Sequence, residues 1–138
     1  MKPYIHNVNY YETDKMGITH HSNYIRFMEE ARLHFLAQAG YPMQRLEAEG
    51  ITSPVVSLHC DYKRPTTYGD KIAITVTVTG YSGVKLSLSY VMHNEAGQVV
   101  ATADSDHCFL DGAGRVIALR KHAPGFHAIL KQALEGQS

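Results

Sequence analysis

The stretch NYIRFMEEARLHFLAQA, residues 23–39, decides the fold of this chain. Its apolar residues recur at spacings of three and four, the period of one helix face, and Asn23 stands where its side-chain oxygen would cap the first turn. The face consists of Tyr24, Phe27, Met28, Ala31 and Phe35. Ile25, Leu33 and Leu36 lie off it. A helix that is apolar over so much of its circumference is expected to be wrapped by other structure.

Most of the remaining sequence alternates between apolar and polar residues with a period of two, which is typical of strands. Glycine-containing turns separate these segments, so short connections predict an antiparallel sheet. The predicted strands are 5–11, 55–64, 71–79, 84–92 and 99–109, with helical segments at 43–49 and 124–134. Only the 23–39 helix is large enough to cover the sheet. The pattern predicts an α+β domain, one long central helix packed in a curled antiparallel sheet of about five strands.

Composition narrows the class of protein. The 138 residues suit one domain, residues 1–138, and 44% hydrophobic against 19% charged residues is a globular balance. Thirteen basic and thirteen acidic residues cancel, which argues against nucleic acid as a partner. No signal-like or membrane-spanning stretch is apparent, so we expect a cytoplasmic protein without membrane insertion. Cys60 and Cys108 are then expected to be free, buried thiols.

The loop before the long helix carries the most chemistry. It places the carboxylate of Asp14 and the imidazoles of His20 and His21 within a few residues of a helix N-terminus. Free N–H groups there suit the oxyanion that forms when a carbonyl is attacked, and a nearby carboxylate can act as nucleophile or as a base on water. The residues alone leave a second interpretation open, in which Asp14 and Asn23 serve only the turn and the cap.

Two sequence blocks point to a family. The block TDKMGITHHSNYIRFMEEAR, residues 13–32, and the block YKRPTTYGD, residues 62–70, closely resemble the signature of the 4-hydroxybenzoyl-CoA thioesterase family. Within that family the chain looks most like the bacterial branch associated with the Tol–Pal region. The resemblance covers roughly residues 5–120. It implies a hotdog fold and hydrolysis of an acyl-CoA thioester to free acid and CoA, with no cofactor beyond the coenzyme A of the substrate.

The resemblance also assigns roles to residues. Asp14 stands at the catalytic aspartate, and His21 at the position whose backbone N–H polarises the thioester carbonyl, with its side chain assisting. Supporting positions are Thr13, Gly17, Asn23, Tyr24 and Glu29. The family pattern further implies a homodimer or a homotetramer, with each site drawn from two chains. Lys15, Met16 and His20 depart from the pattern beside the reacting centre, so the acyl preference stays open.

The sequence also bears on CoA binding, on a metal site and on alternative functions. Lys63, Arg64 and Lys85 are candidates for binding the phosphates of CoA, since cationic side chains favour phosphate. No recognisable ligand spacing accompanies the adjacent histidines, so no metal site is expected. The alternatives to a thioesterase are a hotdog dehydratase or hydratase, and a non-catalytic protein that binds acyl-CoA or acyl carrier protein. The carrier, CoA or acyl carrier protein, and the role of Asp14 as nucleophile or base are left open.

Overall fold

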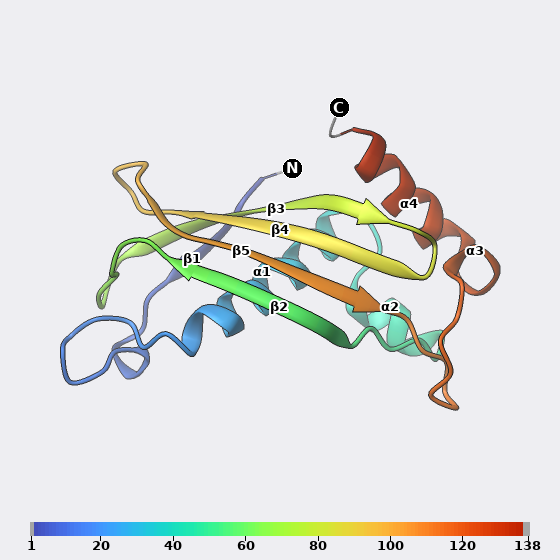
Figure 1. Cartoon of the computed structure of the whole chain (residues 1–138), viewed down its shortest axis with the longest axis horizontal. Helices are drawn as coiled ribbons and strands as arrows, with labels where there is room; N and C mark the ends of the chain where they lie inside the picture. The colour runs from blue at the N-terminus through green and yellow to red at the C-terminus, as the bar shows by residue number, and fades with distance from the viewer. Residues whose placement is uncertain (1, 137–138) are drawn as a thin grey trace. The chain divides into compact units, whose positions relative to one another are not determined.

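The computed structural model describes residues 2–136. Five strands form one antiparallel sheet in the order β1-β3-β4-β5-β2 (Figure 1). The strands are β1 (Tyr4–Asn7), β2 (Val55–Tyr62), β3 (Lys71–Tyr81), β4 (Lys85–His93) and β5 (Val99–Cys108). The helices are the 3-10 helix η1 (Tyr10–Glu12), α1 (Asn23–Gln38), α2 (Met43–Ala48), α3 (Leu119–His122) and α4 (Pro124–Glu135). The expected α+β class is confirmed.

The boundaries differ from expectation mainly at the beginning of the chain. The first strand ends at Asn7 and not at Tyr11, because residues 10–12 turn into η1. The Glu12 carboxylate accepts the backbone N–H of Asn9 at 2.7 Å, which closes this turn. The spacing of these two residues, Asn-x-x-Glu, is that of a capping box. The aromatic residues at positions 10 and 11 are typical of a strand, so the strand was predicted to continue through this turn.

Contacts divide the chain into two compact units. Unit 1 consists of Met1–Phe35, Cys60–Val76 and Tyr90–Ala103. Unit 2 consists of Leu36–His59, Thr77–Ser89 and Asp104–Ser138.

In unit 1, the apolar face of α1 is buried as its spacing predicted. The core of this unit consists of that helix face and of buried residues of the sheet. The helix contributes Tyr24, Phe27, Met28 and Ala31, and the sheet contributes Ile72, Ile74, Tyr90, Met92 and Val100. The opposite side of the helix is open, since Ile25 is 46% and Leu33 is 37% exposed. The expectation that the helix is covered over most of its circumference therefore does not hold for the single chain, because a sheet covers only one face.

In unit 2, aromatic rings organise the core. Phe126 of α4 stacks on Tyr41 with centroids 4.9 Å apart and meets Phe109 edge-on at 5.8 Å. The second predicted helix is confirmed as α2, and the C-terminal helix as α4. The short helix α3 was not predicted. Its four residues, Leu119–His122, are too few to show a helical period in the sequence.

Strand β2 lies at an edge of the sheet, paired with β5 on one side. Every residue of β2 except the half-buried Cys60 is exposed, including the large apolar side chains of Val55, Val56 and Leu58. Edge strands with exposed apolar residues present unpaired backbone groups to another chain. No helix among residues 2–136 is long and apolar enough to cross a membrane.

Candidate functional site

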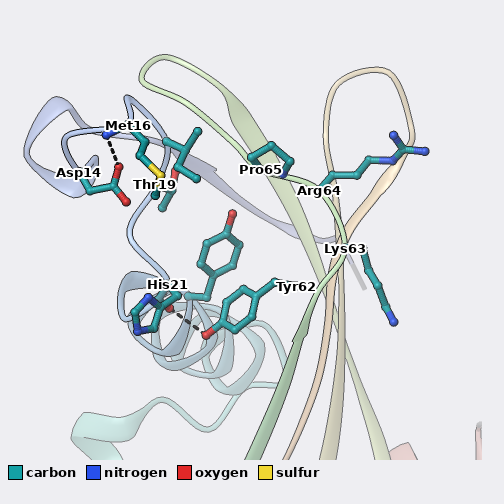
Figure 2. Close-up of a pocket in the computed structure, with 10 residues that line it drawn as sticks. Asp14, Met16, Thr19, His21, Tyr62, Lys63, Arg64 and Pro65 are labelled. Atoms are coloured by element: carbon teal, nitrogen blue, oxygen red, sulfur yellow. Dashed lines mark hydrogen bonds between the residues drawn. The ribbon is translucent and has the colours of Figure 1, made fainter.

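A pocket of about 280 Å³ in unit 1 brings the two predicted catalytic residues together (Figure 2). Its lining residues come from the loop before α1, the start of α1, the end of β2 and the segment that follows β2. They are Asp14, Met16, Ile18, Thr19, His21, Tyr24, Tyr62, Lys63, Arg64 and Pro65. The structure thus assembles Asp14 and His21 in one pocket and adds an apolar and aromatic wall.

The Asp14 carboxylate is held within a tight loop. Its Oδ1 accepts the backbone N–H of Met16 at 2.8 Å, and the Asp14 carbonyl accepts the N–H of Gly17 at 3.0 Å. Gly17 has a φ of 78°, a left-handed conformation that glycine adopts without steric cost. Figure 2 shows Oδ1 turned toward the Met16 N–H and the second carboxylate oxygen turned away from it. Asp14 therefore stabilises its loop with one carboxylate oxygen, while the other oxygen takes no part in that hydrogen bond.

Threonines fasten this loop to the segment after β2. The Thr19 N–H donates to the Thr66 carbonyl at 2.8 Å, and the Thr67 hydroxyl donates to the Gly17 carbonyl at 2.7 Å. The Thr19 and Thr66 hydroxyls are 2.6 Å apart, and both residues are buried. Because Thr66 also contacts the Tyr24 hydroxyl at 2.9 Å, the loop and the first turn of α1 share one anchor.

In the turn that leads into α1, residues 20–24, one backbone donor is open. Four of the five N–H groups of residues 20–24 donate to protein acceptors at 2.8 to 3.2 Å. These four belong to His20, Ser22, Asn23 and Tyr24. Among the hydrogen bonds of the part of the chain that the structure describes, none uses the N–H of His21. An open N–H at a helix N-terminus, in a pocket that also holds a carboxylate, suits an electronegative oxygen.

Tyr62 closes the pocket beside His21. Its hydroxyl donates to the His21 backbone carbonyl at 3.0 Å (Figure 2). Its ring meets the Tyr24 ring edge-on at 5.1 Å. Burial raises the pKa of both the Tyr62 and the Tyr24 hydroxyl. Both phenols therefore stay neutral and able to donate near pH 7. The His21 side chain is exposed, with its ring 4.2 Å from that of His20.

The residues predicted to support the site have different environments. The Thr13 hydroxyl donates to the Tyr10 carbonyl at 2.7 Å, and Tyr24 is buried behind the pocket. Asn23 is itself the first residue of α1, and its side-chain amide donates to the Glu12 carbonyl at 2.8 Å. The hydrogen bond found for this side chain thus ties the helix to the preceding loop instead of capping the helix. Glu29 is exposed on α1.

The three candidate phosphate ligands are divided. Lys63 and Arg64 line the pocket, and Figure 2 shows their side chains extending away from Asp14. Their backbone N–H groups both donate to the Val100 carbonyl, at 2.8 and 3.1 Å. Lys85 belongs to unit 2, where its ammonium lies 3.5 Å from the Asp106 carboxylate. The structure therefore groups two of the three cations with the Asp14 pocket.

Unit 2 contains a larger pocket, of about 550 Å³, that the sequence did not indicate. Its cationic residues are Arg120, Lys121 and Lys131, accompanied by His127, whose Nδ1 is 2.7 Å from the Tyr81 hydroxyl. The first two follow one another on α3 and the third is on α4, so their proximity is a product of the tertiary fold.

The remaining histidines and the cysteines do not join either pocket. His107 is buried, 2.7 Å from the Ser105 hydroxyl. Cys60 and Cys108 are free and half-buried. Within residues 2–136, no group of three or more histidine, cysteine and carboxylate side chains lies close enough together to hold a metal ion.

Comparison with known proteins identifies relatives over most of the chain. Residues 8–133 match the family described as the thioesterase-like superfamily. The chain is 34% identical over 127 residues to YneP of Bacillus subtilis, covering 91% of this chain and 92% of that protein. It is 27% identical over 97 residues to the acyl-CoA thioester hydrolase YbgC of Escherichia coli, covering 70% and 72%.

Solved structures agree with this result. The DHNA-CoA thioesterase of Staphylococcus aureus superimposes with a TM-score of 0.93 at 29% identity, covering 99% of this chain and 93% of that one. The gentisyl-coenzyme A thioesterase BH1999 gives a TM-score of 0.82 at 25% identity, covering 89% and 99%. These likenesses confirm the expected hotdog fold.

Proposed function

Because the chain belongs to the thioesterase-like superfamily, we propose that it hydrolyses acyl-CoA thioesters to the free acid and CoA in the Asp14 pocket. Relatives named as acyl-CoA thioester hydrolase and as CoA thioesterases support this activity. The motif in residues 13–32 further supports a place near the 4-hydroxybenzoyl-CoA thioesterases and their Tol–Pal-associated branch.

One observation carries the proposal. The pocket pairs a carboxylate that has an oxygen to spare with the open N–H of His21 at the start of α1. A thioester carbonyl needs both groups, a nucleophile or base at carbon and a donor at oxygen. The exposed imidazole of His21 is then an assisting group, secondary to the backbone N–H of the same residue.

The chemistry balances in either of two ways. In one, Asp14 attacks the carbonyl carbon, the C–S bond breaks, CoA leaves as thiolate, and water hydrolyses the resulting mixed anhydride. In the other, Asp14 takes a proton from a water that attacks the same carbon, the C–S bond breaks as the tetrahedral intermediate collapses, and CoA leaves as thiolate. Asp14 then gives up its proton to the thiolate or to solvent. The negative charge that develops on the carbonyl oxygen is stabilised by the His21 N–H and the helix dipole in both routes.

The substrate itself supplies the coenzyme. We propose that Lys63 and Arg64 bind phosphate groups of CoA, since both are exposed cations at the Asp14 pocket. Lys85, already near Asp106, is a weaker candidate. The cationic pocket of unit 2 is the alternative location for phosphate. Two double variants distinguish these locations. One combines Lys63→Ala with Arg64→Ala, and the other combines Arg120→Ala with Lys131→Ala. The double variant that raises KM for acyl-CoA identifies the pocket that binds the phosphates.

We also propose that the protein acts as a homodimer whose sites draw on two chains, or as a tetramer formed from two such dimers. The exposed edge strand β2, with Val55, Val56 and Leu58 open on both of its faces, supports association with a second copy. A closed pair of identical chains would cover these residues and the unpaired backbone groups of the edge.

The experiment that tests the function is a hydrolysis screen. Acyl-CoAs of varied length, branching and aromaticity are incubated with the protein, and the released thiol is detected, beside an Asp14→Asn variant of equal folding. An acyl carrier protein loaded with the preferred acyl group forms a second arm and identifies the carrier. Release of thiol by the wild type and its loss in Asp14→Asn are expected. Binding of acyl-CoA without any hydrolysis would point instead to a non-catalytic role.

A further inference from the structure

Behind the pocket, the side chain and the main chain of Glu12 join three structural elements. We infer that Glu12 is a positioning residue for the Asp14–His21 site, a role that rests on the proposed function. It lies two residues before Asp14, it is 6% exposed, and it does not line the pocket. Its contribution therefore acts through other groups and not on the substrate.

The carboxylate of Glu12 holds η1 next to β1. Oε1 accepts the Asn9 backbone N–H at 2.7 Å and lies 2.9 Å from Nε2 of His6 on β1. His6 is itself 5% exposed, with its ring centroid 4.0 Å from that of Phe27 on α1. A buried carboxylate with these two donors holds η1 against β1, and removing it would leave both donors without their acceptor.

The backbone carbonyl of the same residue fixes the other side. It accepts the His20 N–H at 2.8 Å and the Asn23 side-chain amide at 2.8 Å. His20 directly precedes His21, whose N–H is the open donor of the pocket. The position of the Glu12 carbonyl thus sets the backbone that aims this donor, while the chain leaving Glu12 leads within two residues to Asp14.

A second carboxylate, that of Glu30 on α1, also contacts His6. Nδ1 of His6 lies 3.2 Å from the Glu30 carboxylate, which also accepts the Tyr4 hydroxyl at 2.7 Å. Each ring nitrogen of His6 thereby faces a carboxylate oxygen. The titratable groups facing His6 are Glu12, Glu30 and Tyr4, from η1, α1 and β1. Together they connect the three elements around the loop.

The expected consequence is a loss of catalytic alignment with little change in substrate binding. Misplacement of a reacting group by about 1 Å can cost roughly 100-fold in rate, while the pocket walls that bind substrate are unchanged. Glu12→Ala should therefore lower kcat by roughly 10- to 100-fold and leave KM within about threefold. Glu12→Gln keeps an oxygen for the Asn9 N–H, so its kcat should lie within about fivefold of the wild-type value.

The test combines kinetics on the preferred acyl-CoA with hydrogen exchange of residues 13–22 in the substrate-free protein. Glu12→Ala should show the fall in kcat together with faster exchange, and Glu47→Ala, an exposed glutamate on α2, should show neither. If Glu12→Ala does not fold, it is replaced by His6→Gln, which removes the imidazole between the two carboxylates and keeps Glu12, with the same expected direction. Wild-type kcat and wild-type exchange in either folded variant would overturn the inference. A wild-type protein without hydrolysis would instead overturn the proposed function, and the exchange data would still decide whether Glu12 orders the loop.

Discussion

The Tyr62 hydroxyl donates a 3.0 Å hydrogen bond to the backbone carbonyl of His21, across 41 positions of sequence. It joins the last residue of β2 to the turn that opens α1. The same ring forms part of the pocket wall against Tyr24. The wall of the pocket and the backbone that carries the open N–H are thus held by one side chain.

Tyr62→Phe should weaken turnover without abolishing it. The variant keeps the ring against Tyr24 but removes the donor to the His21 carbonyl, at a cost of about 1 kcal/mol in a typical hydrogen bond. A decrease in kcat of roughly three- to tenfold with nearly constant KM is expected. Steady-state kinetics check it, with Tyr11→Phe, an exposed tyrosine outside the pocket, as the matched control. A rise in KM alone would show that the hydroxyl serves binding and not alignment.

His21→Ala should remain a measurable enzyme. The substitution keeps the backbone N–H and the helix dipole and removes only an exposed imidazole. Because loss of a whole oxyanion donor costs roughly 10²–10³ in turnover, the fall should not exceed that range. Initial rates with the preferred acyl-CoA measure it. Complete inactivity of a folded His21→Ala protein would identify the imidazole as the essential base.

Asp14→Asn and Asp14→Ala should separate chemistry from loop stability. Asparagine retains an oxygen for the Met16 N–H, so its melting temperature should stay near that of the wild type while kcat falls by roughly 10²–10⁴-fold. Alanine loses the oxygen as well and should also melt at a lower temperature. Thermal melts and acyl-CoA hydrolysis are measured on the same samples. Near-normal turnover in Asp14→Asn would end the case for Asp14 as the catalytic group.

Asp106 should make the stability depend on pH in the acid range. Hydrogen bonds from Ser87 at 2.6 Å and Ser57 at 2.8 Å lower the pKa of its carboxyl, and Lys85 adds attraction. A group with a lowered folded-state pKa stabilises the fold above its ordinary pKa of 3.8, and this contribution is lost as the pH falls through the folded value.

Asp106→Asn should therefore melt below the wild type at pH 7, and the difference should shrink as the pH falls below about 3.8. Melting temperatures of both proteins between pH 7 and pH 2.5 measure it. Asp104→Asn, at an exposed position of the same strand, provides the control and should show a smaller difference. A difference that stays constant with pH would mean that the carboxylate charge at position 106 is not responsible.

Strand β2 should carry the association between chains. Leu58→Lys places a charge on the exposed edge, which opposes edge-to-edge pairing. Sedimentation is expected to show a dimer or tetramer for the wild type at micromolar concentration and a shift toward monomer for the variant. Gln44→Lys adds the same charge on the exposed surface of α2 and should leave the assembly intact. A wild-type protein that sediments as an active monomer would contradict the proposal.

The sequence by itself determined most of the helices and strands and the place of two candidate site residues in one loop. A period of three to four residues is a local property, so it placed α1 within one residue of its observed end. The alternating strands and their glycine turns are local as well, for example at Gly69 and Gly97, which have φ values of 86° and 81°. Asp14 and His21 lie close together in sequence beside one helix start, and their meeting in one pocket was accordingly predictable.

Only the tertiary structure decided which distant groups complete the site. The pairing of Tyr62 with His21 and of His6 with Glu30 depends on which segments pack together, a property that no local period encodes. The same holds for the membership of Lys63 in unit 1 and of Lys85 in unit 2. The open N–H of His21 can likewise be recognised only from the folded structure. Whether a backbone N–H has an acceptor depends on which carbonyl groups and side chains lie beside it, and the sequence does not give these positions.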